Sequence, residues 1–93
     1  MKLSWDEAKR QKTLADRGLD FADAKQIFDN EHLDALDTRF NYGETRILTL
    51  GFIRSRLCAL VWTPRAETRR VISLRKANED ERKDFEDRMG RPR

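Results

Sequence analysis

Cysteine and histidine are nearly absent from this chain. The 93 residues contain one of each, Cys58 and His32. One cysteine cannot close an internal disulfide, and a single cysteine and a single histidine cannot supply the ligand set of a zinc site. No carboxylate cluster resembles a magnesium site either. We therefore expect a protein without a cofactor or metal, and Cys58 is expected to be a small buried residue.

Long apolar segments and the common catalytic motifs are also missing. No stretch approaches the roughly 20 apolar residues that a membrane span needs, and the first residues lack the apolar core of a signal peptide. There is no glycine-rich phosphate loop, no serine–histidine–aspartate arrangement and no CxxC motif. These absences exclude most familiar enzyme classes. We expect a cytoplasmic protein with no membrane partner.

Charge is abundant and unevenly placed. Charged residues make up 40% of the chain and hydrophobic residues 38%, with a net charge of +3. Residues 1–45 contain 7 Lys/Arg and 10 Asp/Glu, whereas residues 46–93 contain 13 and 7. The basic second half indicates a polyanionic partner such as nucleic acid. The alternative is a solvated surface of mixed charges.

The length allows one domain, over residues 1–93. We expect residues 1–30 to be helical, 33–75 to form an antiparallel sheet and 79–89 to form a C-terminal helix. A domain of this size is marginally stable alone, so a partner chain would help it.

Capping residues predict where the helices begin and end. Asp6 and Gly18 bound a first helix over 7–17, Asp20 opens a second, and Asn78 caps the last. Seven residues in and between the first two helices are expected to face inward at helical spacing: Ala8, Ala15, Leu19, Phe21, Ala24, Ile27 and Phe28. The last helix has only two large apolar residues, Phe85 and Met89. We therefore expect it to dock on another chain.

Four segments have the composition of strands: 33–40, 46–53, 57–63 and 69–75. A further short strand is possible within 1–5. Turns are expected at 41–43, at Arg54-Ser55 and from Pro64 onward. The predicted fold class is therefore α+β, with N-terminal helices packed on one face of a three- to four-stranded antiparallel sheet and a C-terminal helix. Five residues are expected in the core: Leu50, Phe52, Leu60, Ile72 and Leu74.

The other face of this sheet is expected to be open. Simple alternation along the last strand places Arg69, Ser73 and Arg75 on it together. Residues 65–76 contain five basic residues and one acidic residue. Such a surface would suit a phosphodiester backbone.

Several segments together resemble the BrnT family of toxins. They run in the family's order from Trp5 to about Phe85, and the most specific are the following: Trp5-Asp6-Glu7-Ala8-Lys9-Arg10, Gly18-Leu19-Asp20-Phe21, and Ile72-Ser73-Leu74-Arg75-Lys76-Ala77 with Glu81 behind it. The opening W-D-E-x-K and the closing I-S-x-R-x-A are specific in combination.

The resemblance implies a RelE-like fold and a toxin of a type II toxin-antitoxin system. Such a toxin is a ribonuclease that inhibits translation, and a ribbon-helix-helix antitoxin neutralises it and represses the operon. The implied partners are that antitoxin and RNA, either mRNA or ribosome-associated, in a homodimer or a toxin-antitoxin heterotetramer. The family usually has asparagine in the first helix and histidine before its glycine, where this chain has Thr13 and Arg17.

RNA cleavage does not require a metal, because the 2′-hydroxyl can attack its own neighbouring phosphate. The protein must then orient the hydroxyl, accept its proton and stabilise the phosphorane. Arg75 and Arg65 are our candidates for charge stabilisation, since arginine pairs with two phosphate oxygens. Lys9 and the acidic Glu81 are the candidate proton acceptors. Four further residues are candidates for RNA binding: Arg69, Arg17, Lys76 and Ser73.

Each candidate also has a purely structural interpretation. Arg75 could pair with Glu79 or Glu81, and Lys9 could belong to a solvated helix face. Trp62 fits a core position better than a base-stacking one. Two other functions stay open: a binding module that mainly complexes its antitoxin, and a degenerate toxin that binds RNA or ribosomes without cutting.

Overall fold

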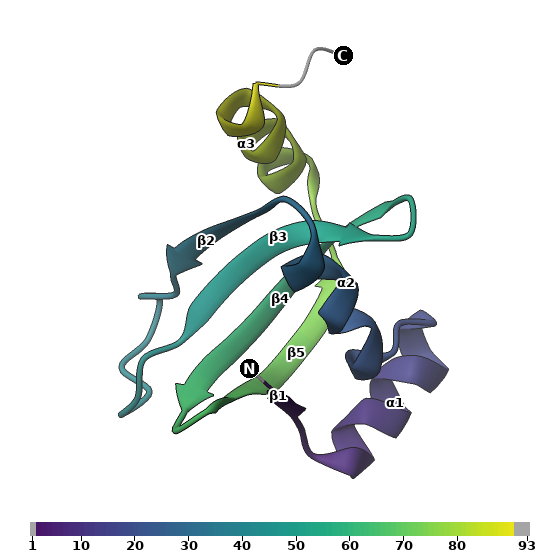
Figure 1. Cartoon of the computed structure of the whole chain (residues 1–93), viewed down its shortest axis with the longest axis vertical. Helices are drawn as coiled ribbons and strands as arrows, with labels where there is room; N and C mark the ends of the chain where they lie inside the picture. Colours follow the sequence, from purple (N-terminus) through teal and green to yellow (C-terminus); the bar gives the residue numbers. More distant parts are fainter. Residues whose placement is uncertain (1, 91–93) are drawn as a thin grey trace.

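The structure, a computed structural model, describes residues 2–90. Its elements follow one another in this order: β1 (Lys2–Ser4), α1 (Glu7–Arg17), the 3₁₀ turn η1 (Phe21–Asp23), α2 (Ala24–Asp29), β2 (His32–Leu36), β3 (Ile47–Ile53), β4 (Arg56–Arg65), β5 (Thr68–Lys76) and α3 (Glu79–Met89). The α+β class is confirmed. The strands form one five-stranded sheet in the order β1-β5-β4-β3-β2 (Figure 1). The sheet is mixed, because β1 pairs with β5 in parallel, so the expected three or four antiparallel strands are corrected.

Helix α1 begins and ends where its caps predict. The Asp6 carboxylate accepts hydrogen bonds from the next turn's backbone, at 2.9 Å from Ala8 N and 3.2 Å from Lys9 N. Gly18 ends the helix at φ 68°. The inward orientation expected for its alanines is wrong, because α1 buries no residue. A forked ion pair instead ties it to the next turn, with Arg10 Nε 2.8 Å from Asp20 Oδ1.

The second helix starts as a 3₁₀ turn at Phe21 and ends at Asp29. Asp20 caps that turn, and Phe21, Ala24 and Ile27 are fully buried. Helix α2 lies very close to β3 at Gly51. A Cβ atom added to Gly51 would lie 2.6 Å from Ile27 Cγ2, so only glycine permits this approach.

The turn between β4 and β5 lies later than expected. The predicted Arg54-Ser55 hairpin is confirmed, but Pro64 belongs to β4 and the chain turns after Arg65. Proline is tolerated there because the pairing of β3 with β4 ends at Trp62. Pro64 therefore has a neighbouring strand only on its β5 side, and its missing N–H breaks no bond to β3.

A β-bulge in β5 overturns the predicted alternation. Val61 pairs with Ser73 while Trp62 pairs with Val71, so Ile72 is an extra residue. Val71 and Leu74, three residues apart, therefore belong to the same core cluster. Ile72 is only half-buried, contrary to expectation.

The two faces of the sheet carry separate cores. We call the face with Leu60, Trp62 and Leu74 the α2 face, because residues of η1 and α2 pack on it. We call the face with the register row Leu50, Ala59 and Arg75 the Arg75 face. Leu50, Leu60 and Leu74 are buried as predicted, and so are Cys58 and Trp62, whereas Phe52 is half-buried.

The Arg75 face is not fully open, because α3 covers one end of it. Phe85 is 1% exposed, and its ring centre lies 5.6 Å from that of Phe52. Figure 1 shows α3 on the opposite side of the molecule from α1. Phe85 is therefore buried within the chain itself, and the docking of this helix on another chain stays a prediction.

Candidate functional site

Arg75 and Glu81, two of the predicted catalytic residues, form a forked ion pair. Arg75 Nη1 donates to Glu81 Oε1 and Nη2 donates to Oε2, both at 2.8 Å. The Arg75 side chain is 36% exposed and that of Glu81 15%. Glu81 also accepts a hydrogen bond from Asn78 N at 2.9 Å as part of the capping box of α3. The junction of β5 with α3 thus fixes the position of both side chains.

The pair is charged at neutral pH. The hydrogen bonds from Arg75 are the largest cause that lowers the pKa of Glu81, against a smaller opposing effect of burial. The same bonds raise the pKa of Arg75. Because its carboxylate is held by a guanidinium and a backbone amide, Glu81 is suited to position Arg75 more than to accept a proton.

A second forked pair, which the sequence analysis missed, lies in the loop between β2 and β3. Arg39 Nε donates to Asp37 Oδ1 at 2.8 Å, and Nη2 donates to Oδ2 at 2.9 Å. Asp37 is 4% exposed and Arg39 66%. The charge of Arg39 also lowers the pKa values of Arg75 and Glu81, which places it near that pair. The Asp–x–Arg spacing signals the pair itself, but only the folded loop brings it to Arg75.

Aromatic rings accompany Arg39. The Tyr42 hydroxyl donates to Asp37 at 3.4 Å, and the Arg46 guanidinium lies 3.8 Å from the centre of the Tyr42 ring. Phe40 packs edge-on against Tyr42 and is 69% exposed. An exposed ring beside a cation offers a stacking surface for an unpaired base.

The other two predicted catalytic residues do not join Arg75. Arg65 pairs with Thr68 in the register, seven residues along β5 from Arg75, which corresponds to about 23 Å of strand. Its guanidinium lies 3.3 Å from a Glu44 carboxylate oxygen. Lys9 is exposed on α1 and bonds to neither member of the Arg75–Glu81 pair.

Of the predicted RNA-binding residues, only Ser73 shares the Arg75 face. The bulge turns Arg69 to the α2 face, where its guanidinium stacks 3.8 Å from the Phe28 ring centre. Lys76 pairs with Cys58, whose side chain packs on the α2 face. Arg17 Nη1 donates to the backbone oxygen of Leu74 at 2.8 Å, so it covers a carbonyl of β5. The expectation that Arg69, Ser73 and Arg75 share one face is therefore wrong.

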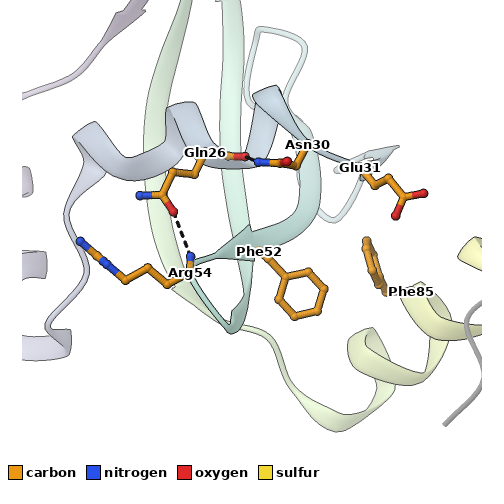
Figure 2. Close-up of a pocket in the computed structure, with 6 residues that line it drawn as sticks. All are labelled: Gln26, Asn30, Glu31, Phe52, Arg54 and Phe85. Atoms are coloured by element: carbon orange, nitrogen blue, oxygen red, sulfur yellow. Dashed lines mark hydrogen bonds between the residues drawn. The ribbon is translucent and has the colours of Figure 1, made fainter.

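A hollow of about 440 Å³ separates α2 from α3. It is lined by Gln26, Asn30, Glu31, Phe52, Arg54 and Phe85. Figure 2 shows the two phenylalanine rings on one side and the hydrogen-bonded Gln26 on the other. The Gln26 side chain accepts from Arg54 N at 2.9 Å, and its backbone oxygen accepts from Asn30 Nδ2 at 2.8 Å. These hydrogen bonds link neighbouring segments of the chain, and the described residues that line the hollow do not form a catalytic arrangement.

Two further observations concern residues 2–90. Within them, no three histidine, cysteine, aspartate or glutamate side chains gather closely enough to hold a metal ion. No helix in the same range is long and apolar enough to cross a bilayer.

Comparison with known families decides the identity. Residues 5–81 match the family described as ribonuclease toxin, BrnT, of type II toxin-antitoxin system. The chain belongs to the BrnT family. The BrnT match extends from Trp5 to Glu81 and so contains the whole Arg75–Glu81 pair. Membership makes the protein a toxin-antitoxin ribonuclease toxin and implies an antitoxin partner. No curated protein matches the chain.

Proposed function

We propose that this BrnT protein is a metal-independent endoribonuclease that inhibits translation in the cytoplasm, with its active surface around Arg75 and Glu81. A ribbon-helix-helix antitoxin neutralises it, and the fold is RelE-like. The observation that carries the proposal is that two hydrogen bonds to Glu81 hold the Arg75 guanidinium in one orientation. A guanidinium has five N–H groups, and Arg75 uses three, on Glu81 and on the backbone oxygen of Lys76. Two N–H groups stay available for a phosphate.

The chemistry follows from this arrangement. The RNA 2′-hydroxyl loses its proton to water and attacks the adjacent phosphorus. The bond from phosphorus to the 5′-oxygen breaks, and that oxygen takes up a proton from water as the 2′,3′-cyclic phosphate forms. Arg75 stabilises the negative charge that grows on the phosphorane oxygens. Glu81 holds the guanidinium in place, so little reorganisation is needed during the reaction. Arg39 adds a second positive charge, and Phe40 stacks against a base beside the scissile bond. Ser73 contacts the RNA on the same face.

Proton transfer is the weakest part of this site. The pKa of Glu81 is lowered, which makes it a poor base. General acid–base help contributes typically about 10²- to 10⁴-fold, so a nuclease without a good base is slow and still active. Lys9, Arg65, Arg17 and Lys76 are proposed as secondary contacts to a longer RNA.

The test is induction of single variants in cells that lack the antitoxin, with RNA integrity read on a gel. Arg75→Ala is expected to abolish growth inhibition and RNA cleavage while leaving the fold and antitoxin binding intact. Lys12→Ala is the matched control, because Lys12 is exposed and pairs only with Asp16. Full toxicity of Arg75→Ala would reject this surface. Growth arrest by the wild type with intact RNA would reject the nuclease.

A second function, antitoxin binding without catalysis, has one observation in its favour. Arg17 stands where the family usually has histidine, and its guanidinium is engaged with the Leu74 carbonyl. A guanidinium has only donor groups and no acceptor, so it does not replace an imidazole as a base. Purified protein that binds its antitoxin and RNA but leaves the RNA uncut both with and without a chelator would favour this function.

A further inference from the structure

A pocket of about 620 Å³ opens on the α2 face between β1, α2 and β5. Leu3, Trp5 and Phe28 supply its apolar wall, and all three are half-buried against the core beneath α2. Arg69 lines it from β5. The β-bulge at Ile72 is the reason that Arg69 faces this pocket and not the Arg75 face.

Arg69 is a cation without a counter-ion. Its guanidinium carbon lies 3.8 Å from the ring centre of Phe28 and 5.3 Å from that of Trp62. Its Nε is buried and has no hydrogen-bond partner. Within residues 2–90, no carboxylate forms an ion pair with it. A buried polar group left unpaired is costly, and an anion supplied by a ligand would remove that cost.

The surroundings of Arg69 are positive as well. Lys2 and Lys25 also line the pocket, and Asp29 is the one carboxylate among the described residues that line it. Because Asp29 is paired with Lys25, the charge of Arg69 stays uncompensated. A phosphate monoester carries about −1.5 to −2 charges at neutral pH and three acceptor oxygens, so it can bind the guanidinium more strongly than a single peptide carboxylate does.

Trp5 completes the site. Its indole N–H donates to Glu7 Oε1 at 3.0 Å, which holds the ring in position beside the pocket. An indole on the wall of a pocket is a platform on which a nucleobase of any sequence can stack. A phosphate and an aromatic base in one molecule are the chemistry of a nucleotide.

We propose that this pocket binds a single nucleotide, with its phosphate at Arg69 and its base against Trp5. The site lies on the opposite face of the sheet from Arg75 and Glu81, so it is separate from the proposed cleavage surface. It does not depend on cleavage, because a nucleoside monophosphate has no phosphodiester bond to cut.

The test is a titration of the purified protein with nucleoside 5′-monophosphates, followed by tryptophan fluorescence and by calorimetry. Saturable binding is expected, at least about tenfold tighter than for the nucleoside or for inorganic phosphate, because each fills only half of the pocket. Arg69→Gln should weaken binding at least about tenfold, since it removes a charge-assisted contact. Arg69→Lys, which keeps the charge but loses the planar donor pair, should weaken it less.

Arg70→Gln is the matched control, because Arg70 is the next residue of β5 and its side chain belongs to the opposite face. It should bind nucleotide as the wild type does. Trp5→Phe should keep calorimetric binding while the fluorescence change becomes smaller, because Trp62 lies 5.3 Å from Arg69 and still reports on it. Circular dichroism verifies that each variant is folded, and Arg69→Lys replaces Arg69→Gln if the latter does not fold.

Three outcomes would overturn the proposal. Equal binding of inorganic phosphate and nucleotide would reduce the pocket to an anion site. Nucleotide binding unchanged by both Arg69→Gln and Arg69→Lys would place the nucleotide site elsewhere. Binding of an acidic peptide in preference to every nucleotide would make the pocket a docking site for a protein partner.

Discussion

At the residue scale, the decisive feature is the use of one carboxylate for two purposes. Glu81 closes the capping box of α3 and also holds Arg75 by two hydrogen bonds of 2.8 Å. Capping boxes accept glutamate or glutamine at this position, so the cap alone does not require a charge. Glutamate, unlike glutamine, presents two acceptor oxygens to the Arg75 guanidinium.

The first prediction concerns pH and stability. The folded-state pKa of Glu81 is lower than its ordinary value of 4.5, so its stabilising contribution is present above about pH 4.5 and is lost as the pH falls through the lowered pKa. Glu81→Gln keeps the cap and removes the charge. We expect this variant to lose less stability than the wild type between about pH 5 and pH 3 in urea unfolding.

The control for this prediction is Glu67→Gln, since Glu67 is exposed in the turn between β4 and β5. The unfolding free energy of this variant should fall with decreasing pH as that of the wild type does. Identical pH profiles for Glu81→Gln and the wild type would show that the ion pair contributes nothing to stability.

At the element scale, α3 is held by little more than one side chain. Phe85 is its one buried residue in the described structure, and Met89 packs only in part. The remaining contacts are the Arg75–Glu81 pair and its caps. Such an element opens before the sheet does, because few apolar contacts hold it.

The second prediction follows from that weak attachment. Phe85→Ala removes the ring that packs on Phe52, and we expect a loss of about 3 kcal/mol in unfolding free energy. Hydrogen exchange should show that the amides of α3 lose protection while those of β3 and β4 keep it. Arg88→Ala, on the exposed side of the same helix, should change stability by less than about 0.5 kcal/mol. Full protection of α3 in the Phe85 variant would contradict this account.

At the scale of the whole molecule, the basic residues are divided between the two faces of one sheet. Arg39 and Arg75 serve the Arg75 face, while Arg69 and Arg17 are engaged on the other side. The net charge of +3 is a sum over the whole chain, so it does not describe the local positive potential at either face. RNA held at the Arg75 face would be drawn mainly by its phosphates.

The third prediction measures that attraction. Affinity for a single-stranded, 2′-O-methylated RNA, which cannot be cleaved, should fall as salt rises, since phosphate neutralisation releases counter-ions. Arg39→Ala and Arg75→Ala should each lower the slope of log affinity against log salt by about 0.7. Fluorescence anisotropy gives both slopes, and Lys12→Ala should leave the slope unchanged. A wild-type affinity that ignores salt would exclude phosphate contacts at this face.

The sequence by itself determined those features of the fold that depend on interactions between residues close together in the chain. Asp6, Gly18 and Asn78 bound their helices because a cap satisfies backbone groups within a few residues of itself. The hairpin at Arg54-Ser55 and the Arg75–Glu81 pair, six residues apart, are local for the same reason. The family resemblance, carried by short motifs, is likewise confirmed.

Only the tertiary structure decided which side chains meet across the sheet. One extra residue at Ile72 moves Arg69 to the other face, because side chains alternate with a period of two and a single insertion reverses the order. Arg65 is separated from Arg75 by the length of a strand, and Arg39 approaches it through a loop fold with no local signature. Register and loop path depend on contacts far apart in the sequence, so patterns within a few residues cannot specify them.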